Sequence, residues 1–265
     1  MYRGNRLKSH LRAGNTAFGI VHALAHAAMA EMIGLAGFDF VLIDGEHGQG
    51  DHQAHLGCLQ AVAGTPAQAI LRAESSGRTV LKRLLDLGVE GVMIPCVSSV
   101  EQAREVVRSC RYPPDGVRGF AASGVRASDY GFQTNRYLRE HSSQLLIAAM
   151  IESREGVENI AGIASVDGID VIQVGANDLS YDLGVPGQLD HPSLIDALAA
   201  IEASTLANGK ILGGAPSLGM DVSELVRRGY RMITMGRDVG IFAKGLTAVL
   251  QESQAADHRE SRLEE

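Results

Sequence analysis

The chain has 265 residues, of which 45% are hydrophobic and 21% charged, as in an ordinary globular domain. Its 24 lysines and arginines face 31 aspartates and glutamates, and the net charge of −7 argues against binding nucleic acid or an anionic membrane surface. No apolar run approaches the ~20 residues that cross a bilayer. The N-terminus shows no apolar secretory stretch, so we expect a cytoplasmic protein.

The three cysteines, Cys58, Cys96 and Cys110, form an odd and widely spaced set that does not make a disulfide framework. Such a set suits a reducing compartment. Cys96 and Cys110 stand in apolar surroundings, so we expect both to be small buried side chains.

Eight short apolar runs follow one another along the chain, each followed by a turn and a segment with helical periodicity. Runs that are apolar throughout are typical of strands covered on both faces. The predicted strands are Phe18–His22, Phe40–Ile43, Ala69–Leu71, Gly91–Ile94, Leu145–Ile151, Val171–Val174, Ile211–Gly213 and Met232–Met235.

Helix signals stand between these runs. Ser99 and Gln102 form a capping-box pattern, and Leu194–Leu206 carries apolar residues at helical spacing. Eight repeats of strand and helix in this length predict one closed (β/α)8 barrel over residues 1–253, in preference to an open doubly wound sheet. The polar segment Gln254–Glu265 predicts a frayed C-terminal tail.

In such a barrel the functional side chains stand at the carboxyl ends of the strands. Charged residues placed directly after apolar strands must be solvated, paired or bound to a ligand. Here they occur in the segments Asp44–His47, Arg72–Glu74, Glu152–Ser153, Gly175–Asp178 and Gly236–Asp238.

Glu152 and Asp178 close neighbouring predicted strands, so we expect their carboxylates to converge at one rim of the barrel. Two carboxylates, completed by waters and substrate oxygens, suit an ion like Mg²⁺ or Mn²⁺. The alternative is that each carboxylate caps the following helix or pairs with an arginine.

His47, Arg72 and Asp86 are further candidates. His47 suits a general acid or base, because an imidazole titrates near neutrality, although a lone histidine is more often structural. Arg72 can grip a carboxylate with two N–H groups, unless Glu74 or Glu46 already holds it. Asp86 ends a predicted helix, where its negative charge opposes the helix dipole. This cost favours a partner such as a histidine; the alternative is that the carboxylate is solvated.

Four segments carry a family resemblance: FDFVLIDGEH, LRAESSGRTVLKRLLDLGVEGVMIPCVSSVEQAREVVRSCRYPPDGVRGF, MIES and VGANDLSYDLGVPG. They resemble the HpcH/HpaI family of class II, metal-dependent pyruvate aldolases, from about Phe18 to about Gly245. Members cleave 4-hydroxy-2-oxoheptanedioate and 2-keto-3-deoxy sugar acids. The resemblance implies a (β/α)8 TIM barrel of the phosphoenolpyruvate/pyruvate superfamily.

The resemblance also implies roles for individual residues. Glu152 and Asp178 match the carboxylates that bind a divalent metal ion, which is Mg, Mn or Co. His47 matches the catalytic base, and Asp86 matches the acid that pairs with it. Arg72 matches the arginine that contacts the pyruvate end and steadies the enolate.

Asp44 and Glu46 flank the base and are expected to support it from a second layer of residues. Two positions depart from the family pattern. Met150 stands where the better-known aldolases carry a glutamine, and Asn177 stands where they carry an alanine. Both lie near the enolate-binding end, so we expect Met150, Asn177 and Asp178 to border the substrate.

The implied activity is a reversible, catabolic cleavage of a 4-hydroxy-2-oxo acid to pyruvate and an aldehyde through a metal-bound pyruvate enolate. The implied assembly is a homo-oligomer, a hexamer or trimer of dimers, whose last helix is exchanged between barrels. The loop Phe120–Gln133, with Arg126, is expected to influence the choice of aldehyde. Two alternatives stay open: a citrate-synthase-like condensation of acetyl-CoA with oxaloacetate in siderophore biosynthesis, and a non-catalytic keto-acid-binding paralogue.

Overall fold

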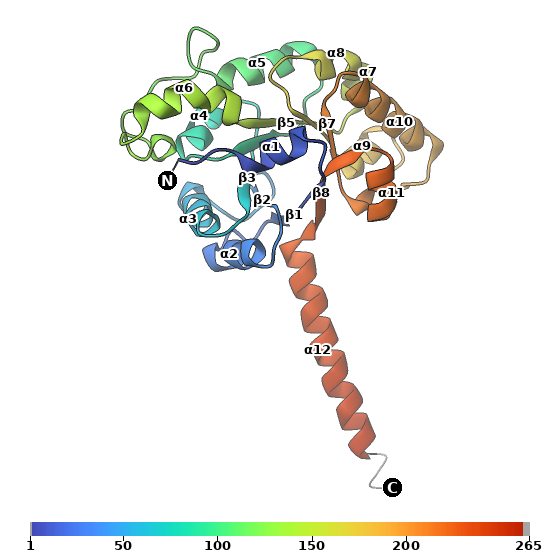
Figure 1. Cartoon of the computed structure of the whole chain (residues 1–265). Coiled ribbons are helices and arrows are strands. Elements are labelled where there is room, and N and C mark those ends of the chain that lie inside the picture. Colours follow the sequence, from blue (N-terminus) through green and yellow to red (C-terminus); the bar gives the residue numbers. More distant parts are fainter. Residues whose placement is uncertain (1, 262–265) are drawn as a thin grey trace.

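The computed structural model describes residues 2–261, with Ser217 and residues 256–261 described by backbone only. Eight parallel strands close into a barrel in chain order, which confirms the predicted fold (Figure 1). Every predicted strand lies within two residues of an observed one at either end. The strands are β1 Ala17–His22, β2 Phe40–Asp44, β3 Gln68–Arg72, β4 Gly91–Ile94, β5 Leu146–Ile151, β6 Val171–Val174, β7 Ile211–Gly214 and β8 Tyr230–Arg237.

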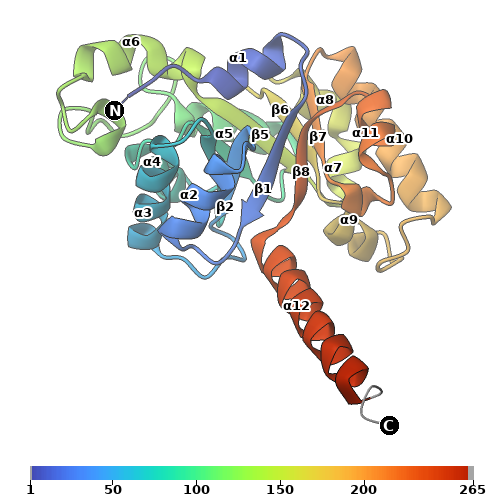
Figure 2. The same ribbon diagram turned by 60° about the horizontal axis from the view of Figure 1, so that its bottom comes forward.

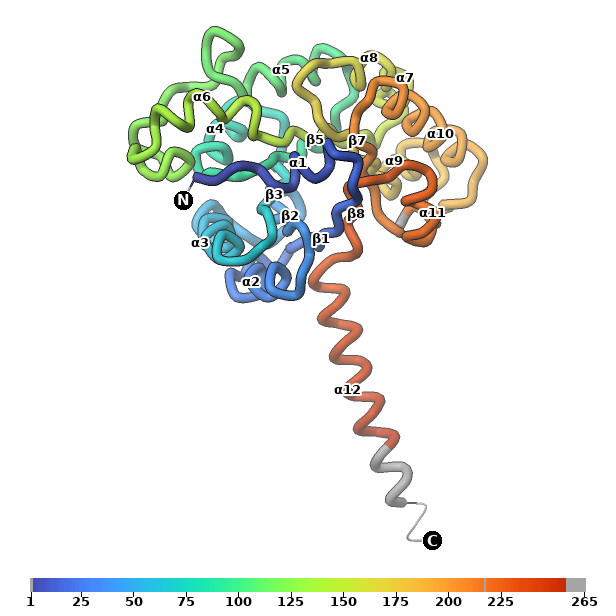
Figure 3. Tube along the Cα trace, viewed as in Figure 1, coloured from blue at the N-terminus to red at the C-terminus, as the bar shows by residue number. Residues whose placement is uncertain are grey.

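Helices connect the strands and surround the barrel, and Figure 3 traces this path along the chain. The predicted cap at Ser99 is confirmed, because its hydroxyl accepts the N–H of Gln102 at 3.1 Å. The helices are α1 Arg6–Arg12, α2 Ala27–Leu35, α3 His52–Ala63, α4 Arg78–Asp86, α5 Val100–Cys110, α6 Thr134–Gln144, α7 Arg154–Glu158, α8 Ile160–Ser165, α9 Ala176–Asp182, α10 Pro192–Ala207, α11 Val222–Arg227 and α12 Asp238–Ser261, with short 3₁₀ turns η1 Arg126–Ser128 and η2 Pro216–Leu218.

Alternate side chains of the strands fill the barrel interior. Phe40, Leu42 and Ile70 belong to this inner cluster, together with Leu7 and Leu11 of α1. Helix α1 therefore closes the amino-terminal end of the barrel with two buried leucines. The carboxyl-terminal end has no such plug among the described residues, and a cavity opens there.

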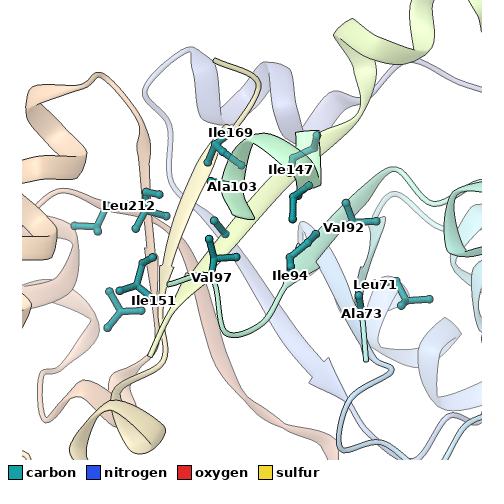
Figure 4. Close-up of a cluster of buried hydrophobic side chains, with 14 of the residues drawn as sticks. Leu71, Ala73, Val92, Ile94, Val97, Ala103, Ile147, Ile151, Ile169 and Leu212 are labelled. Carbon is teal, nitrogen blue, oxygen red and sulfur yellow. The ribbon is translucent and has the colours of Figure 1, made fainter. Parts of the chain in front are cut away.

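The other strand side chains face outward and pack against the helices. Leu71, Val92, Ile94 and Ile147 belong to this outer core with Ala103 of α5 (Figure 4). Each strand is thus buried on both faces, which explains why the sequence shows continuous apolar runs instead of alternation.

Helix α12 leaves the barrel at the end of β8 and projects away from it (Figures 1 and 2). Its first residue, Asp238, accepts N–H groups from Ala23 and Leu24 and lies 2.7 Å from Nδ1 of His22. The helix then exposes a series of apolar side chains: Val239, Ile241, Phe242, Leu246, Val249 and Leu250.

Helix α12 continues through the polar segment from Gln254 as far as Ser261, because glutamine, alanine, glutamate and arginine are good helix formers. The rest of the expected tail, residues 262–265, lies outside the described residues. Within residues 2–261 the structure contains no helix of the length and apolarity that a bilayer crossing requires.

We expect Phe40→Ala to lower the free energy of unfolding by about 3–5 kcal/mol, since the ring is fully buried inside the barrel. A Cβ on Gly19 of β1 would collide with this ring, so the site is closely packed. Phe132→Ala is the matched control, because Phe132 is 88% exposed and its loss should change stability by less than about 0.5 kcal/mol. Urea titration followed by circular dichroism measures both, and similar losses would contradict this packing.

Candidate functional site

A cavity of about 500 Å³ opens at the carboxyl ends of the strands. This is the end at which (β/α)8 enzymes carry their active sites. Its inner wall is made by strand side chains and its mouth by residues that follow the strands. The wall includes Leu42, Met93, Met150, Gln173 and Thr234, and the mouth includes His47, Arg72, Asn177, Asp178 and Arg237.

The ends of β2 and β3 are joined by a buried ion pair. Asp44 and Arg72 are register partners, and Arg72 donates from Nε and Nη2 to the two oxygens of Asp44 at 2.9 and 2.7 Å. The third nitrogen of Arg72 lies 2.9 Å from Glu46. Sequence analysis left an ion pair as the alternative for Arg72, and the structure shows that the arginine is paired and still borders the cavity.

Burial opposes the charged form of Asp44, but the hydrogen bonds and charge of Arg72 outweigh it. The backbone N–H groups of His47 and Glu46 act in the same direction, and the pKa of Asp44 falls below its usual range. Burial likewise works against the charge of Arg72, but Asp44 and Glu46 more than compensate, so its pKa rises. Both residues are therefore ionised at neutral pH.

His47 stands in the loop after β2, where its backbone N–H donates to Asp44 at 3.1 Å. Its side chain is 59% exposed, and its Nε2 lies 3.9 Å from an oxygen of Glu46. The imidazole lines the cavity mouth near Arg72. Asp44 thus fixes the backbone of the residue that carries the imidazole, and the ring stays accessible to a substrate.

Glu152 follows β5 and is only 6% exposed. One oxygen accepts the backbone N–H of Cys96 at 2.6 Å. A Cβ on Gly175 would lie 2.6 Å from the other oxygen, so glycine is required beside this carboxylate. Burial raises the pKa of Glu152, and the nearby charges of Glu46 and Asp178 raise it further. The hydrogen bond from the N–H of Cys96 lowers this pKa but does not offset the rise. Asp178 itself lies in the first turn of α9.

Cys96 is exposed, contrary to the expectation of a buried thiol, while Cys58 and Cys110 are buried. The strand β4 ends at Ile94, and the chain turns with Cys96 at φ 53°. Functional side chains were expected at the carboxyl ends of the strands, and the same expectation applied to β4 would have identified Cys96 as a candidate.

Glu46, Cys96 and Glu152 each offer a ligand atom, and these atoms all lie within 4.8 Å of one another. Carboxylate oxygens beside a thiol are a donor set that suits a divalent cation. The residues at this rim therefore fit a metal ion, with Asp178 close enough for its charge to act on Glu152.

Asp86 is not brought to His47 within the chain. It ends α4, and its carboxylate accepts Nη2 of Arg118 at 2.7 Å. Arg118 is fully buried and also donates to Tyr137 at 2.7 Å. This cluster lies near Leu145, at the amino-terminal end of the strands, since α4 runs back along the barrel after β3. The partner that Asp86 was expected to need is an arginine.

Arg126 lies at the same end, where it donates to the carbonyl of Leu87 at 2.7 Å. In a single chain it does not border the cavity that holds His47. Met150 and Asn177 do border that cavity, as the sequence led us to expect. Sequence reasoning did not single out Gln173 or Thr234, which line the same space, and it named Arg237 only within the strand-end segment Gly236–Asp238.

A parallel (β/α)8 barrel with a histidine, an arginine and converging carboxylates at its carboxyl-terminal end defines an enzyme site. Residues 18–245 match the family model of HpcH/HpaI aldolase/citrate lyase, and the chain belongs to this family. It is a carbon–carbon lyase of the aldolase type.

Relatives and solved structures agree with this assignment. A 4-hydroxy-2-oxo-heptane-1,7-dioate aldolase of Salmonella arizonae is 36% identical over 92% of this chain and 93% of its own length. An HpcH/HpaI aldolase/citrate lyase family protein from Burkholderia cenocepacia is 31% identical, with a TM-score of 0.89 over 94% of this chain and 99% of its own. The citrate synthase SbnG is 28% identical, with a TM-score of 0.85 over 94% and 98%.

We expect Asp44→Asn to lower the free energy of unfolding by about 3 kcal/mol at pH 7, because it leaves the buried charge of Arg72 without its main partner. The lowered pKa of Asp44 means that its contribution is complete above its ordinary value of 3.8 and is lost as the pH falls below it. The deficit should therefore shrink in acid. Denaturant titrations at pH 7 and pH 3 measure it.

Asp196→Asn on the exposed face of α10 is the matched control for that change. It should leave stability within about 0.5 kcal/mol of the parent at both pH values. A deficit of Asp44→Asn that stays constant from pH 7 to pH 3 would contradict the role given to the carboxylate charge.

Proposed function

We propose that this aldolase reversibly cleaves a 4-hydroxy-2-oxo acid to pyruvate and an aldehyde, with the help of a divalent metal ion. The observation that carries the proposal is the convergence of His47, Arg72, Glu152 and Asp178 at one end of the barrel. The similarity to 4-hydroxy-2-oxo-heptane-1,7-dioate aldolases over 92% of the chain supports it. We place the reaction in the cytoplasm, where three free cysteines stay reduced.

Glu152 and Asp178 would hold the metal ion, with Glu46 and Cys96 beside it. A bound divalent cation supplies positive charge that stabilises the negative charge developing on the keto oxygen of the pyruvate half. The raised pKa of Glu152 is caused mainly by burial, and a divalent cation beside the carboxylate would oppose this shift. Carboxylate ligation alone would not select among Mg²⁺, Mn²⁺ and Co²⁺.

The chain's own groups would supply the remaining steps. Arg72 uses N–H groups left after Asp44 and Glu46 are bound to orient the pyruvate end at the cavity mouth. His47 removes the proton from the C4 hydroxyl, the C3–C4 bond breaks, and the electron pair stays on the pyruvate half as the aldehyde leaves. A proton is then returned to C3, which gives pyruvate.

A second candidate is the condensation of acetyl-CoA with oxaloacetate. The similarity to the citrate synthase SbnG at a TM-score of 0.85 favours it, as do the departures at Met150 and Asn177. Both reactions pass through a stabilised carbanion, so the same rim of charges suits either. Citrate formation from these two substrates, measured by mass spectrometry, decides between them.

We expect the protein to exchange the C3 protons of pyruvate with D₂O when Mn²⁺ or Mg²⁺ is supplied, as followed by NMR. EDTA should abolish the exchange. His47→Ala should slow it by about 100-fold or more, because the general base is removed. Glu152→Gln should weaken Mn²⁺ binding by about tenfold or more, as measured by electron paramagnetic resonance.

His10→Ala and Glu31→Gln are the matched controls for these two variants, because both side chains are exposed and neither lines the cavity. They should behave like the parent in both measurements. Exchange that persists in EDTA, or that survives the loss of His47, would rule out the proposed mechanism.

We also propose that the enzyme is a homo-oligomer, a hexamer or trimer of dimers, in which α12 packs on a neighbouring barrel. The exposed apolar side chains along α12 support this, since such a surface marks an interaction site. Phe242→Asp should lower the molar mass measured by light scattering toward the 28.1 kDa of one chain. Lys244→Gln on the same helix is the control, and an unchanged mass of the Phe242 variant would argue against this contact.

A further inference from the structure

One donor atom at the acidic rim is a sulfur to which the mechanism above gives no role. Cys96 follows β4 and is exposed, whereas Cys58 and Cys110 are buried. Its Sγ and one carboxylate oxygen each of Glu46 and Glu152 lie within 4.8 Å of one another. The three residues follow β4, β2 and β5, so the closure of the barrel brings them together. An ion from the solvent can reach this thiol.

The main chain that carries the thiol is held by the end of β5. The N–H of Cys96 donates to Glu152 at 2.6 Å, and the N–H of Val97 donates to the carbonyl of Met150 at 3.1 Å. Cys96 takes φ 53°, a left-handed conformation that residues other than glycine seldom adopt. Because both hydrogen bonds come from the backbone, a change of the side chain at position 96 leaves both donors in place.

The carboxylate beside the thiol is the one at this rim that lacks a cation. Glu152 is only 6% exposed. Within residues 2–261 no lysine, arginine or histidine forms an ion pair with it, whereas Glu46 lies 2.9 Å from Nη1 of Arg72. A buried carboxylate without an opposite charge is costly, and a bound cation removes that cost. Independently of the thiol, the burial of Glu152 thus points to an ion at this carboxylate.

Without an ion, the thiol is inert. Burial and the hydrogen bond to Glu152 raise the pKa of Cys96 to about 12, so the side chain is protonated at neutral pH and is a poor nucleophile. A divalent ion reverses the local balance of charge. It binds the thiolate, and the proton of the thiol passes to the solvent as the ion arrives.

A sulfur donor changes which ions the site prefers. Oxygen ligands suit Mg²⁺ and Mn²⁺, whereas a thiolate favours softer ions. Zn²⁺ accepts carboxylate oxygens and thiolate sulfur in the same site. Zn²⁺ and Co²⁺ bind most sites more tightly than Mn²⁺ does, so the informative quantity is how far the sulfur increases that difference.

We propose that Sγ of Cys96 is a direct ligand of the metal ion, beside Glu152, and that it strengthens the selection of Zn²⁺ and Co²⁺ over Mg²⁺ and Mn²⁺. This inference rests on the proposed function, which requires the metal ion. The ligand set would then mix sulfur with the carboxylates of Glu152 and Asp178. Mg²⁺ and Mn²⁺ would still occupy the carboxylates, at higher concentrations than the softer ions need.

The first test is the absorption spectrum of Co²⁺ added to the full-length protein after its metal has been removed with EDTA. A cobalt–thiolate bond gives a charge-transfer band in the ultraviolet that oxygen ligands do not give. We expect this band in the parent and its loss in Cys96→Ser. Cys110→Ala is the matched control and should keep the band, because this thiol is buried and lies outside the cluster. A parent without the band, or a band that survives in Cys96→Ser, would overturn the proposal.

The second test compares the dissociation constants of Zn²⁺, from competition with a chromogenic chelator, and of Mn²⁺, from electron paramagnetic resonance. Cys96→Ser should weaken Zn²⁺ binding by about 100-fold or more and Mn²⁺ binding by less than about threefold, because sulfur is the softer donor. Cys96→Asp, whose side chain tolerates a positive φ, should bind Mn²⁺ more tightly than the parent and Zn²⁺ more weakly. Equal weakening of both ions in Cys96→Ser would mean that the thiol only positions Glu152, and would overturn the proposal.

Neither readout needs turnover, so this proposal and the proposed function fail separately. Normal metal-dependent exchange of the C3 protons of pyruvate, without a cobalt–thiolate band, overturns ligation by Cys96 alone. A cobalt–thiolate band without exchange under any ion, Zn²⁺ and Co²⁺ included, overturns the proposed function and leaves the bond between metal and sulfur in place.

Discussion

The buried pair of Asp44 and Arg72 organises the functional end of the barrel. It joins the last residues of two adjacent strands, and both oxygens of the carboxylate are used. The same carboxylate holds the backbone of Glu46 and His47, so the loop after β2 takes its shape from an ion pair. Breaking this pair would leave a buried charge without a partner, which lowers the free energy of unfolding. The geometry of the loop after β2 therefore depends on the same interaction that stabilises the folded chain.

The carboxylate side of the site depends instead on backbone. Glu152 has no arginine among its described hydrogen-bond partners; it is held by the N–H of Cys96 and faces a glycine at position 175. Three strands, β4, β5 and β6, thus meet at one buried carboxylate. Burial works against the charged form of this carboxylate, so a cation beside it would stabilise the charge, which is the arrangement that the proposed metal site requires.

The cavity combines this acidic rim with two arginines on separate strands. Arg72 is locked by two carboxylates, whereas Arg237 makes one long contact with Asp44. Asp44 and Glu46 therefore hold the guanidinium of Arg72 in place, whereas a single carboxylate holds that of Arg237.

The sequence by itself determined the barrel, because eight strands buried on both faces leave continuous apolar runs in predictable positions. It also placed His47, Arg72, Glu152 and Asp178 at strand ends. It did not reveal α1, whose short segment carries only two buried apolar residues, Leu7 and Leu11. Only the tertiary structure decided the partners: Asp86 meets Arg118, Cys96 reaches the acidic rim, and Gln173 extends over Gly213. Periodicity fixes which face a residue takes, but contacts between residues far apart in the chain arise only when the barrel closes.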